Sequence, residues 1–184
     1  MRVIGGNVGG LNLKGPVDKT VRPTTERVRS AIFNIIAPEQ YVNGRTLDLF
    51  AGTGSLGIET LSRGASHCDF VEGNSSQLKI LRDNLAFTGF TGQSKAYRMD
   101  ILKGLGSLKG PYDMVLMDPP YKMAEISEFL VQFSKHNNIF DERTLIVVGH
   151  SKRMPLRESY DTLHCVDSRS YGDNAIKLYE CREG

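Results

Sequence analysis

The segment DPPY, Asp118 to Tyr121, contains the residue types needed to hold and activate a flat aromatic amine, and it follows the apolar run Met114–Met117. Such an amine is a poor nucleophile because its lone pair is delocalised into the ring. A carboxylate and a rigid backbone carbonyl can accept its two N–H groups, and Tyr121 can stack on the ring. Pro119 and Pro120 stiffen the corner. We therefore take Asp118, Pro119, Pro120 and Tyr121 as candidate catalytic residues; the alternative is a stiff loop without chemistry.

A glycine-rich loop, DLFAGTGSLG, stands between an expected strand and an expected helix, with Gly52, Gly54 and Gly57 in a G-x-G-x-x-G spacing. The pattern alone is typical of dinucleotide binding, with Glu72 near the place of a ribose-binding acid. Asp48, four residues before Gly52, argues against a pyrophosphate because two like charges would repel. It favours a cationic nucleoside cofactor, S-adenosylmethionine, whose sulfonium and ammonium groups attract an acid.

Two further acids follow strands of the expected sheet. Glu72 ends the second strand, where it can accept from ribose hydroxyls, and Asp100 ends the third, where it can accept from an adenine amino group. With Asp48, they match one extended ligand lying along the sheet edge. The alternative is that these acids only cap the following helices.

Strands and helices alternate through most of the chain. The apolar spacing predicts strands at 45–50, 67–72, 95–100, 112–118 and 144–150, with helices at 55–63, 75–87 and about 126–133 between them. A glycine-rich hairpin and a helix opening at Pro23 precede this core, and a hairpin turning at Gly172–Asp173 ends it. The pattern indicates an α/β fold with a doubly wound, mostly parallel sheet, which binds ligands at the carboxyl ends of its strands.

Composition is that of an ordinary globular domain. The chain has 184 residues, 40% of them hydrophobic and 24% charged, so we expect one domain, residues 1–184, with an N-terminal part (1–38) and a Rossmann-like core (39–184). No apolar run is long enough to cross a bilayer, and no leader peptide is evident. With only three cysteines, we expect no disulfide scaffold and a cytoplasmic protein.

Basic residues are concentrated at the start of the chain. Residues 1–29 contain six basic and two acidic side chains, a net charge of +4 against +2 for the whole protein. A basic front end on a near-neutral body indicates an anionic partner such as nucleic acid. A solvated basic face without a partner is the alternative.

The cysteines do not indicate a metal site or a nucleophile. His67–Cys68 and His164–Cys165 are adjacent pairs on expected strands, so their side chains point to opposite faces and cannot chelate together. None of the three cysteines lies where cytosine C5 methylation would need a nucleophile.

At this point a family resemblance becomes clear. DLFAGTGSLG, VE, MD and DPPY, in this order, resemble the class I S-adenosylmethionine-dependent methyltransferases that act on exocyclic amines. The segments MRVIGG, RPTTERVRSAIFNI, LDLFAGTGSLGIETLSRGA and YGD are similar to the RsmD family, which methylates the 2-amino group of a guanine in small-subunit (16S) ribosomal RNA. The resemblance extends over essentially the whole chain. It implies a seven-stranded sheet with an antiparallel last strand and a monomeric enzyme that acts on an assembled or partly assembled 30S particle.

The resemblance also implies roles for particular residues. The cofactor would be lined by Asp48, Phe50, Ala51, Gly52, Thr53, Gly54, Glu72, Gly73, Asp100 and Ile101. Apart from the resemblance, the position of Arg22, Thr24, Thr25, Arg27 and Arg29 on or just before the first helix indicates that they bind RNA phosphate, and Tyr171 is a candidate for the base pocket. The alternatives are a helix cap at Thr24 or Thr25, solvated arginines and a Tyr171 that packs in the hairpin. Gly149 stands where the family pattern often has an acid, so its role stays open.

Two other functions stay open at this stage. DPPY does not name the base, so a DNA methyltransferase acting on adenine N6 or cytosine N4 is one alternative. The other is a non-catalytic protein that binds S-adenosylmethionine and RNA.

Overall fold

The computed structural model describes residues 1–16, 25–120 and 126–182. Its helices are α1 (Glu26–Ile35), α2 (Ser55–Ser62), α3 (Ser75–Thr88), α4 (Ile101–Gly104) and α5 (Ile126–Phe133), with single 3-10 turns at Pro38–Gln40, Thr91–Gln93 and Leu105–Ser107. Its strands are β1 (Arg45–Leu49), β2 (His67–Val71), β3 (Ser94–Tyr97), β4 (Met114–Met117), β5 (Leu145–Ser151), β6 (Ser159–Tyr160), β7 (Leu163–Tyr171) and β8 (Asn174–Cys181).

One twisted sheet runs through the molecule in the order β3-β2-β1-β4-β5-β8-β7-β6. The first five strands in this order are parallel, and β8 lies antiparallel to β5. The expected doubly wound α/β fold is thus confirmed, but the expected count of seven strands is wrong. The eighth is β6, a two-residue strand that pairs with β7 at the edge of the sheet.

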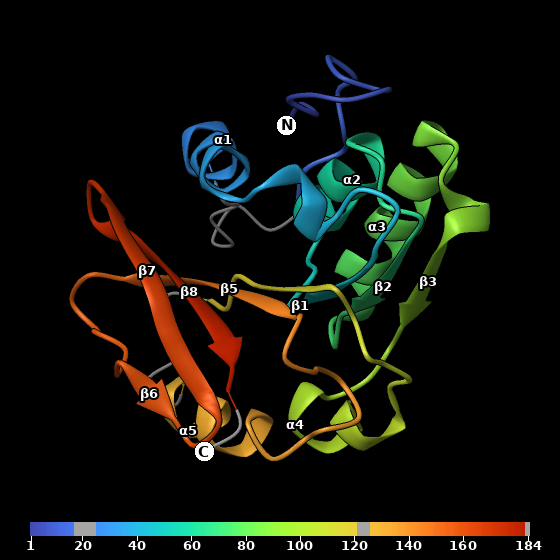
Figure 1. Ribbon diagram of the computed structural model, residues 1–184. Helices are drawn as coiled ribbons and strands as arrows, with labels where there is room; N and C mark the ends of the chain where they lie inside the picture. The colour runs from blue at the N-terminus through green and yellow to red at the C-terminus, as the bar shows by residue number, and fades with distance from the viewer. Residues whose placement is uncertain (17–24, 121–125, 183–184) are drawn as a thin grey trace.

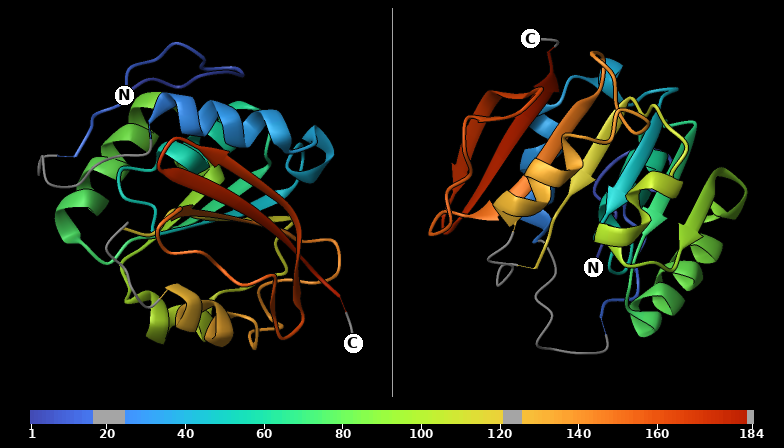
Figure 2. Two further views of the ribbon diagram at one scale, coloured as in Figure 1. Left: turned by 90° about the vertical axis from the view of Figure 1, so that its left-hand side faces the viewer. Right: turned by 90° about the horizontal axis from the view of Figure 1, so that it is seen from below.

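Helices cover both faces of the sheet, as Figure 2 shows edge-on, with α1, α2 and α3 on one side and α4 and α5 on the other. The buried side chains of β4 alternate accordingly. Met114 and Leu116 pack with α1, whereas Val115 and Met117 pack with the aromatic side of α5. A strand covered on both faces must be apolar throughout, which explains the unbroken run before Asp118. The inward positions expected for α5 are confirmed, since Ile126, Phe129, Leu130 and Phe133 are all buried.

The expected N-terminal hairpin is present as a chain reversal with a single antiparallel bridge, between Arg2 and Asn12. It lies above α1 and α2 in Figure 1, away from the sheet. The expected terminal hairpin is confirmed, since β7 and β8 pair across a turn at Gly172 and Asp173.

Parallel pairing aligns the ends of the central strands. Leu49 of β1 lies opposite both Val71 of β2 and Met117 of β4, and Met117 lies opposite Val148 of β5. We call the side where β1, β2, β4 and β5 end the carboxyl edge, and the side where they begin the amino edge. The loops that follow these strands therefore meet at one place.

Candidate functional site

The loop after β1 forms a compact turn at the carboxyl edge. Phe50, Gly52 and Gly54 have positive φ values of 62°, 55° and 86°. Ala51 donates its N–H to the carbonyl of Val71 at 3.0 Å, and Gly54 donates to the carbonyl of Ala51 at 2.7 Å. A positive φ is uncommon for a residue with a side chain, so Phe50 marks a point of backbone strain held in place by its surroundings. Strain of this kind is concentrated at ligand-binding loops.

The three glycines of the loop, Gly52, Gly54 and Gly57, are needed for different physical reasons. A Cβ on Gly54 would lie 2.2 Å from Cδ1 of Leu81, and one on Gly57 would lie 2.3 Å from Cε1 of Phe70, so these two allow α2 and α3 to pack closely. A Cβ on Gly52 would meet nothing within 4 Å among the described residues. Gly52 is therefore the glycine that faces open space, where a ligand can approach the backbone.

Asp48 is buried within the carboxyl edge, with 1% of its surface exposed. One carboxylate oxygen, Oδ2, accepts the N–H of Gly57 at 2.8 Å in the first turn of α2. Burial raises the pKa of Asp48 to about 8, and the nearby carboxyl groups of Asp118 and Glu72 add to this shift. A cation placed beside these acids would favour their ionised forms, whereas an anion would not.

Glu72 follows β2 and supports the glycine loop. Its Oε2 accepts the N–H of Gly52 at 2.8 Å, and its Oε1 accepts the N–H of Asn74 at 2.7 Å. Each carboxylate oxygen has a second lone pair, so Glu72 can still accept from a ligand while holding the loop. Gly73 is exposed next to it.

Asp100 does not end the third strand, because β3 stops at Tyr97. It is instead the N-cap of α4, accepting the N–H of Leu102 on Oδ1 at 3.0 Å, so the helix-capping alternative is realised for this acid. Ile101 is the first residue of α4 and packs against the core on that side of the sheet. The strand was predicted too long because the sequence does not reveal where edge pairing ceases.

Asp118 follows β4 directly, and its carboxyl group is enclosed by protein although part of the side chain remains accessible. Burial raises the pKa of Asp118 to about 7. Pro119 is buried and Pro120 is exposed, whereas Tyr121 lies outside the described residues. A Cβ on Gly149 of β5 would lie 2.8 Å from Oδ1 of Asp118, so the absence of a side chain at Gly149 leaves room for this carboxyl group.

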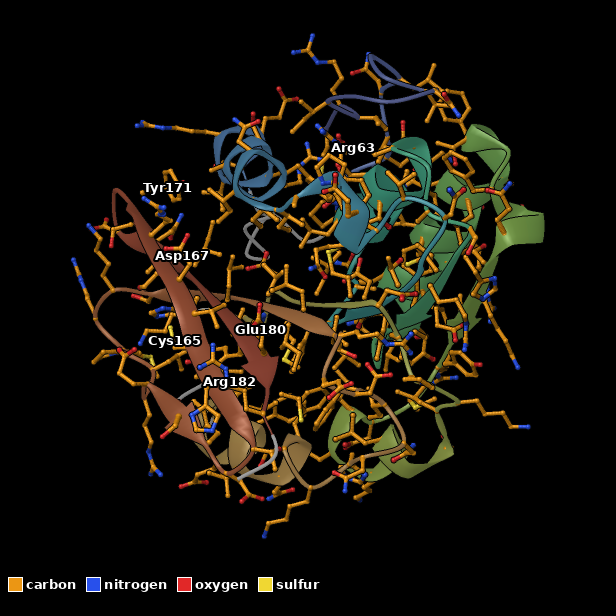
Figure 3. All side chains as sticks on the ribbon, viewed as in Figure 1. Arg63, Cys165, Asp167, Tyr171, Glu180 and Arg182 are labelled. Carbon is orange, nitrogen blue, oxygen red and sulfur yellow. The ribbon has the colours of Figure 1, made fainter. Side chains whose placement is uncertain are left out.

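The expected RNA-binding residues are spread around α1 and the tip of the terminal hairpin. Thr25 caps α1 by accepting the N–H of Val28 at 3.3 Å, and Arg27 is exposed. Tyr171 lies near the tip of the hairpin, where it packs against the core beneath α1 (Figure 3). Arg22 and Thr24 lie outside the described residues.

The expectation that Arg29 binds RNA phosphate is wrong, and so is the alternative that it lies on a solvated basic face. The side chain is fully buried and donates from Nη2 to the carbonyl of Arg2 at 2.7 Å. Burial lowers its pKa, while the negative charges of Glu59 and Glu26 oppose that effect. Its helical position faces the core because Ile32, three residues later on the same side, is buried too.

Two buried polar residues of the helices were missed by sequence analysis. Asn84 of α3 donates from Nδ2 to the carbonyls of Thr53 and Lys14, at 2.9 and 3.0 Å, and so ties the glycine loop to the N-terminal segment. Glu59 of α2 accepts the N–H groups of Ile4 and Gly5 at 2.8 Å. The available signal was a polar residue on the apolar side of each helix, next to Ile58 and Leu85.

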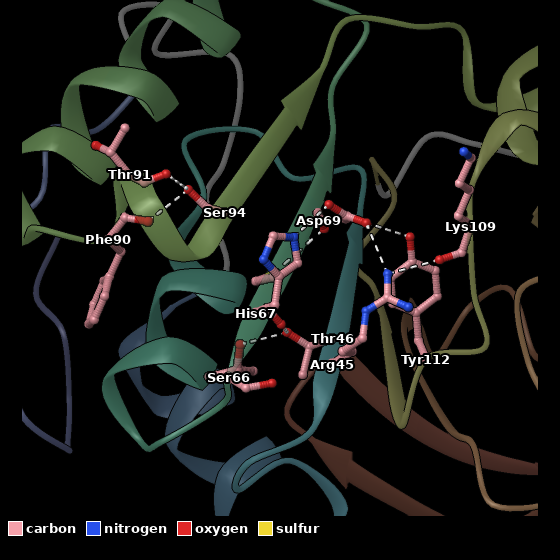
Figure 4. A network of polar contacts seen from close by, with 12 residues as sticks. Arg45, Thr46, Ser66, His67, Asp69, Phe90, Thr91, Ser94, Lys109 and Tyr112 are labelled. Carbon is pink, nitrogen blue, oxygen red and sulfur yellow. Dashed lines mark hydrogen bonds and ion pairs between the residues drawn. The ribbon is translucent and has the colours of Figure 1, made fainter.

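Another buried acid lies toward the amino edge, in a network that Figure 4 shows from close by. Asp69 accepts the hydroxyl of Tyr112 at 2.6 Å and faces Nε2 of His67 at 3.0 Å and Nη2 of Arg45 at 3.8 Å. The guanidinium of Arg45 also lies over the ring of Tyr112, 4.9 Å from its centroid. Both carboxylate oxygens of Asp69 have partners inside the protein, so we assign this network a role in stability.

The three cysteines are free thiols in buried or half-buried positions. Cys68 is buried and burial raises the pKa of its thiol well above the ordinary value; Cys165 and Cys181 are half-buried free thiols. In the described part of the chain, no group of three or more His, Cys, Asp or Glu side chains is arranged to hold a metal ion. No described helix combines the length and the apolar character needed to cross a membrane.

Comparisons with known proteins agree over nearly the full chain. The family described as Conserved hypothetical protein 95 matches residues 1–180. "Putative rRNA methyltransferase YlbH" of Bacillus subtilis is 34% identical over 185 residues, covering 99% of this chain and 100% of the relative. "Ribosomal RNA small subunit methyltransferase D" of Escherichia coli is 31% identical over 181 residues, covering 98% of this chain and 89% of the relative.

A solved structure extends the agreement to the fold. The Escherichia coli protein titled "Putative methyltransferase yhhF" superposes with a TM-score of 0.85 at 30% identity, covering 99% of this chain and 98% of the other. The resemblance drawn from the sequence motifs is therefore confirmed. The chain belongs to the Conserved hypothetical protein 95 family and is an RsmD-type methyltransferase.

Proposed function

We propose that this protein transfers the methyl group of S-adenosylmethionine to the exocyclic 2-amino group of a guanine in small-subunit ribosomal RNA. The observation that carries the proposal is the placement of Asp118 at the carboxyl edge, beside the glycine loop of β1 and close enough to Asp48 to raise its pKa. The names of the relatives from Bacillus subtilis and Escherichia coli, both ribosomal RNA methyltransferases, support the substrate.

The hydrogen-bonding groups and the open backbone position at the carboxyl edge support the binding of S-adenosylmethionine there. Gly52 faces open space, Glu72 has lone pairs to spare for ribose hydroxyls, and the second oxygen of Asp100 is left for an adenine amino group. The buried acids offer a site for positive charge. In this proposal the cofactor is lined by Asp48, Phe50, Ala51, Gly52, Thr53, Gly54, Glu72, Gly73, Asp100 and Ile101. When bound, it supplies an electrophilic methyl group.

The DPPY corner is proposed to hold the target amine. Asp118 accepts one N–H of the amine, and the backbone carbonyl of the proline corner accepts the other. This geometry fixes the nitrogen beside the methyl group, and the stiffness of Pro119 and Pro120 limits the entropy lost on binding. A pKa of about 7 suits Asp118 to take up the proton that the amine loses when its nitrogen is methylated. Tyr121 is assigned to stacking on the base.

The RNA is proposed to contact Arg22, Thr24, Thr25, Arg27 and Tyr171, which precede or belong to α1 and the tip of the terminal hairpin. The bonds from Glu59 and Asn84 to the N-terminal segment support one domain over residues 1–184. We further propose a cytoplasmic monomer that acts on RNA in a small ribosomal subunit or its precursor.

Radiolabelled S-adenosylmethionine tests this function. The protein is incubated with naked small-subunit RNA, with small subunits and with DNA, and the labelled base is mapped. We expect label on a guanine 2-amino group of the RNA or the subunit. Label confined to adenine N6 or cytosine N4 of DNA would reverse the substrate assignment, and RNA binding without transfer to any of the three would identify a non-catalytic protein.

A further inference from the structure

The end of β5 forms a tight turn that belongs neither to the cofactor site nor to the DPPY corner. Met154 donates its N–H to the carbonyl of Ser151 at 3.0 Å, and Arg153 donates its N–H to Oγ of Ser151 at 3.2 Å. The turn is joined to the terminal hairpin by the N–H of Lys152, which donates to the carbonyl of Asp173 at 3.0 Å. We call residues 151–154 the β5 turn.

A buried histidine supports the β5 turn from below. His150 is 6% exposed, and its Nδ1 lies 3.0 Å from the carbonyl of Ser151 and 3.2 Å from the carbonyl of Met154. Only an N–H can satisfy two carbonyl acceptors, so the proton of the neutral ring is on Nδ1. Burial lowers the pKa of His150, which agrees with a neutral ring. The backbone of the turn is therefore held from inside the protein, while its side chains are left for other contacts.

The two basic side chains of the β5 turn, Lys152 and Arg153, are both exposed. Neither takes part in an ion pair among the described residues. Some other exposed basic residues are paired, such as Lys14 with Asp83 and Arg143 with Asp141. Others, such as Lys109 and Lys135, also have no ion partner in the described part of the chain, but Lys152 and Arg153 are the only two Lys or Arg residues that are adjacent in the sequence. Two adjacent positive charges without acidic partners on a fixed backbone can bind an anion without first breaking an internal pair.

The β5 turn is close to the proposed methylation site. The register of β4 and β5 leads from Met117 and Val148 to Asp118 and Gly149, where a Cβ would lie 2.8 Å from the Asp118 carboxylate. Lys152 is three residues further along, or roughly 10 Å at the rise of an extended chain. That span corresponds to roughly three nucleotides of a stacked strand at ~3.4 Å each.

We propose that the β5 turn is an RNA phosphate site, in which Lys152 and Arg153 bind the backbone of the nucleotides that flank the guanine held at Asp118. The proposal rests on the proposed function for the identity of the base. Phosphate contacts carry no sequence information, but they fix the register of the RNA and so decide which base reaches the DPPY corner.

The test uses the salt dependence of RNA binding. The variant Lys152→Gln with Arg153→Gln is compared with wild type for binding to naked small-subunit RNA across a range of salt concentrations. Each phosphate contact contributes about 0.7 to 0.9 to the slope of log affinity against log salt, so we expect the slope to fall by about 1.5. In methyl transfer, KM for RNA should rise by about tenfold or more, with kcat and the affinity for S-adenosylmethionine unchanged.

Two matched variants complete the experiment. Lys109→Gln with Lys135→Gln removes the same charge from the amino edge, where Lys109 precedes β4 and Lys135 follows α5, and it should leave the slope unchanged. Lys152→Arg with Arg153→Lys keeps both charges and should retain the wild-type slope. An unchanged slope in the glutamine variant of the β5 turn, or an equal loss in the amino-edge variant, would overturn the proposal.

The slope and the methyl transfer separate this proposal from the proposed function. If wild type methylates the RNA guanine but the β5 turn variant binds RNA with the wild-type slope, only the phosphate site is refuted. If the slope falls as expected but wild type transfers no methyl group to RNA, the phosphate site stands and the proposed function is refuted.

Discussion

Buried carboxyl groups lie at both edges of the sheet, but their hydrogen-bond and charge partners differ. Toward the amino edge, Asp69 is surrounded by Tyr112, His67 and Arg45, which supply a hydroxyl donor and positive charge. At the carboxyl edge, Asp48 accepts one backbone N–H and has the acids Asp118 and Glu72 as its charged neighbours. The first acid is stabilised within the protein. The acids at the carboxyl edge have no positively charged partner among the described residues, and a bound cation would stabilise them. This is typical of a ligand-binding site.

Replacing Asp118 with asparagine should reduce methyl transfer far more than the same replacement of Asp69 at the amino edge, and this is the largest effect that we expect. The amide cannot take up the proton of the amine, so we expect kcat to fall by about 10³-fold while the protein stays folded. Single-turnover methyl transfer with saturating RNA and S-adenosylmethionine measures the effect. The matched control is Asp69→Asn, which should retain most of the activity at temperatures where it is folded. Equal losses in both variants would show that the two edges do not differ in function.

The pH dependence of stability should differ between wild type and Asp118→Asn in the absence of ligand. The folded-state pKa of Asp118 is about 7, above its ordinary value, so its contribution to stability is fully present below about pH 4 and is lost as the pH rises to 7. Relative to the variant, wild type should become less stable over this window, by a few kcal/mol at most. Urea unfolding at pH 4.5, 6 and 7.5 checks the sign; a difference independent of pH would contradict it.

Asp69→Asn should destabilise the protein through the loss of its network. The amide is a weaker acceptor than a carboxylate for the hydroxyl of Tyr112 and gives no attraction to Arg45, so we expect a loss of about 2 kcal/mol in the free energy of unfolding. Urea denaturation measures it. A double-mutant cycle with Tyr112→Phe should show a coupling of about 1 kcal/mol, because the two side chains share one hydrogen bond. Strict additivity would mean that the network is not cooperative.

Gly149→Ala should have the smallest of the four effects. Its Cβ would lie 2.8 Å from Oδ1 of Asp118, so the carboxyl group must move by a few tenths of an ångström or more. We expect kcat to fall by about tenfold with little change in stability, because the displaced atom is the end of a side chain. Steady-state kinetics beside thermal denaturation checks this. Unchanged kcat would mean that the position of the Asp118 carboxyl group tolerates such a shift.

The local sequence pattern predicted the elements of the fold correctly where the apolar periodicity matches the buried face. The buried face of α5, the strands β1, β2 and β4, and the terminal hairpin were all predicted within a residue or two. It was insufficient at edges, where β3 ends early at Tyr97 and β6 adds an eighth strand. Edge pairing depends on backbone hydrogen bonds to a partner that is distant in the chain, and side-chain spacing does not encode it.

The sequence identified four residues of the candidate site, because residue types and expected strand ends can both be recognised in the sequence. They are Asp48, Gly52, Glu72 and Asp118. The sequence by itself determined these chemical groups and the alternating α/β order that gathers them. Only the tertiary structure decided that Arg29 is buried, that Gly54 and Gly57 serve packing, that Asp100 caps α4, and that the side chains of the β5 turn remain exposed. Burial and pairing depend on neighbours that the fold brings together from distant parts of the chain. The pKa of a side chain, and whether that side chain is free to bind a ligand, depend on those neighbours and not on its residue type.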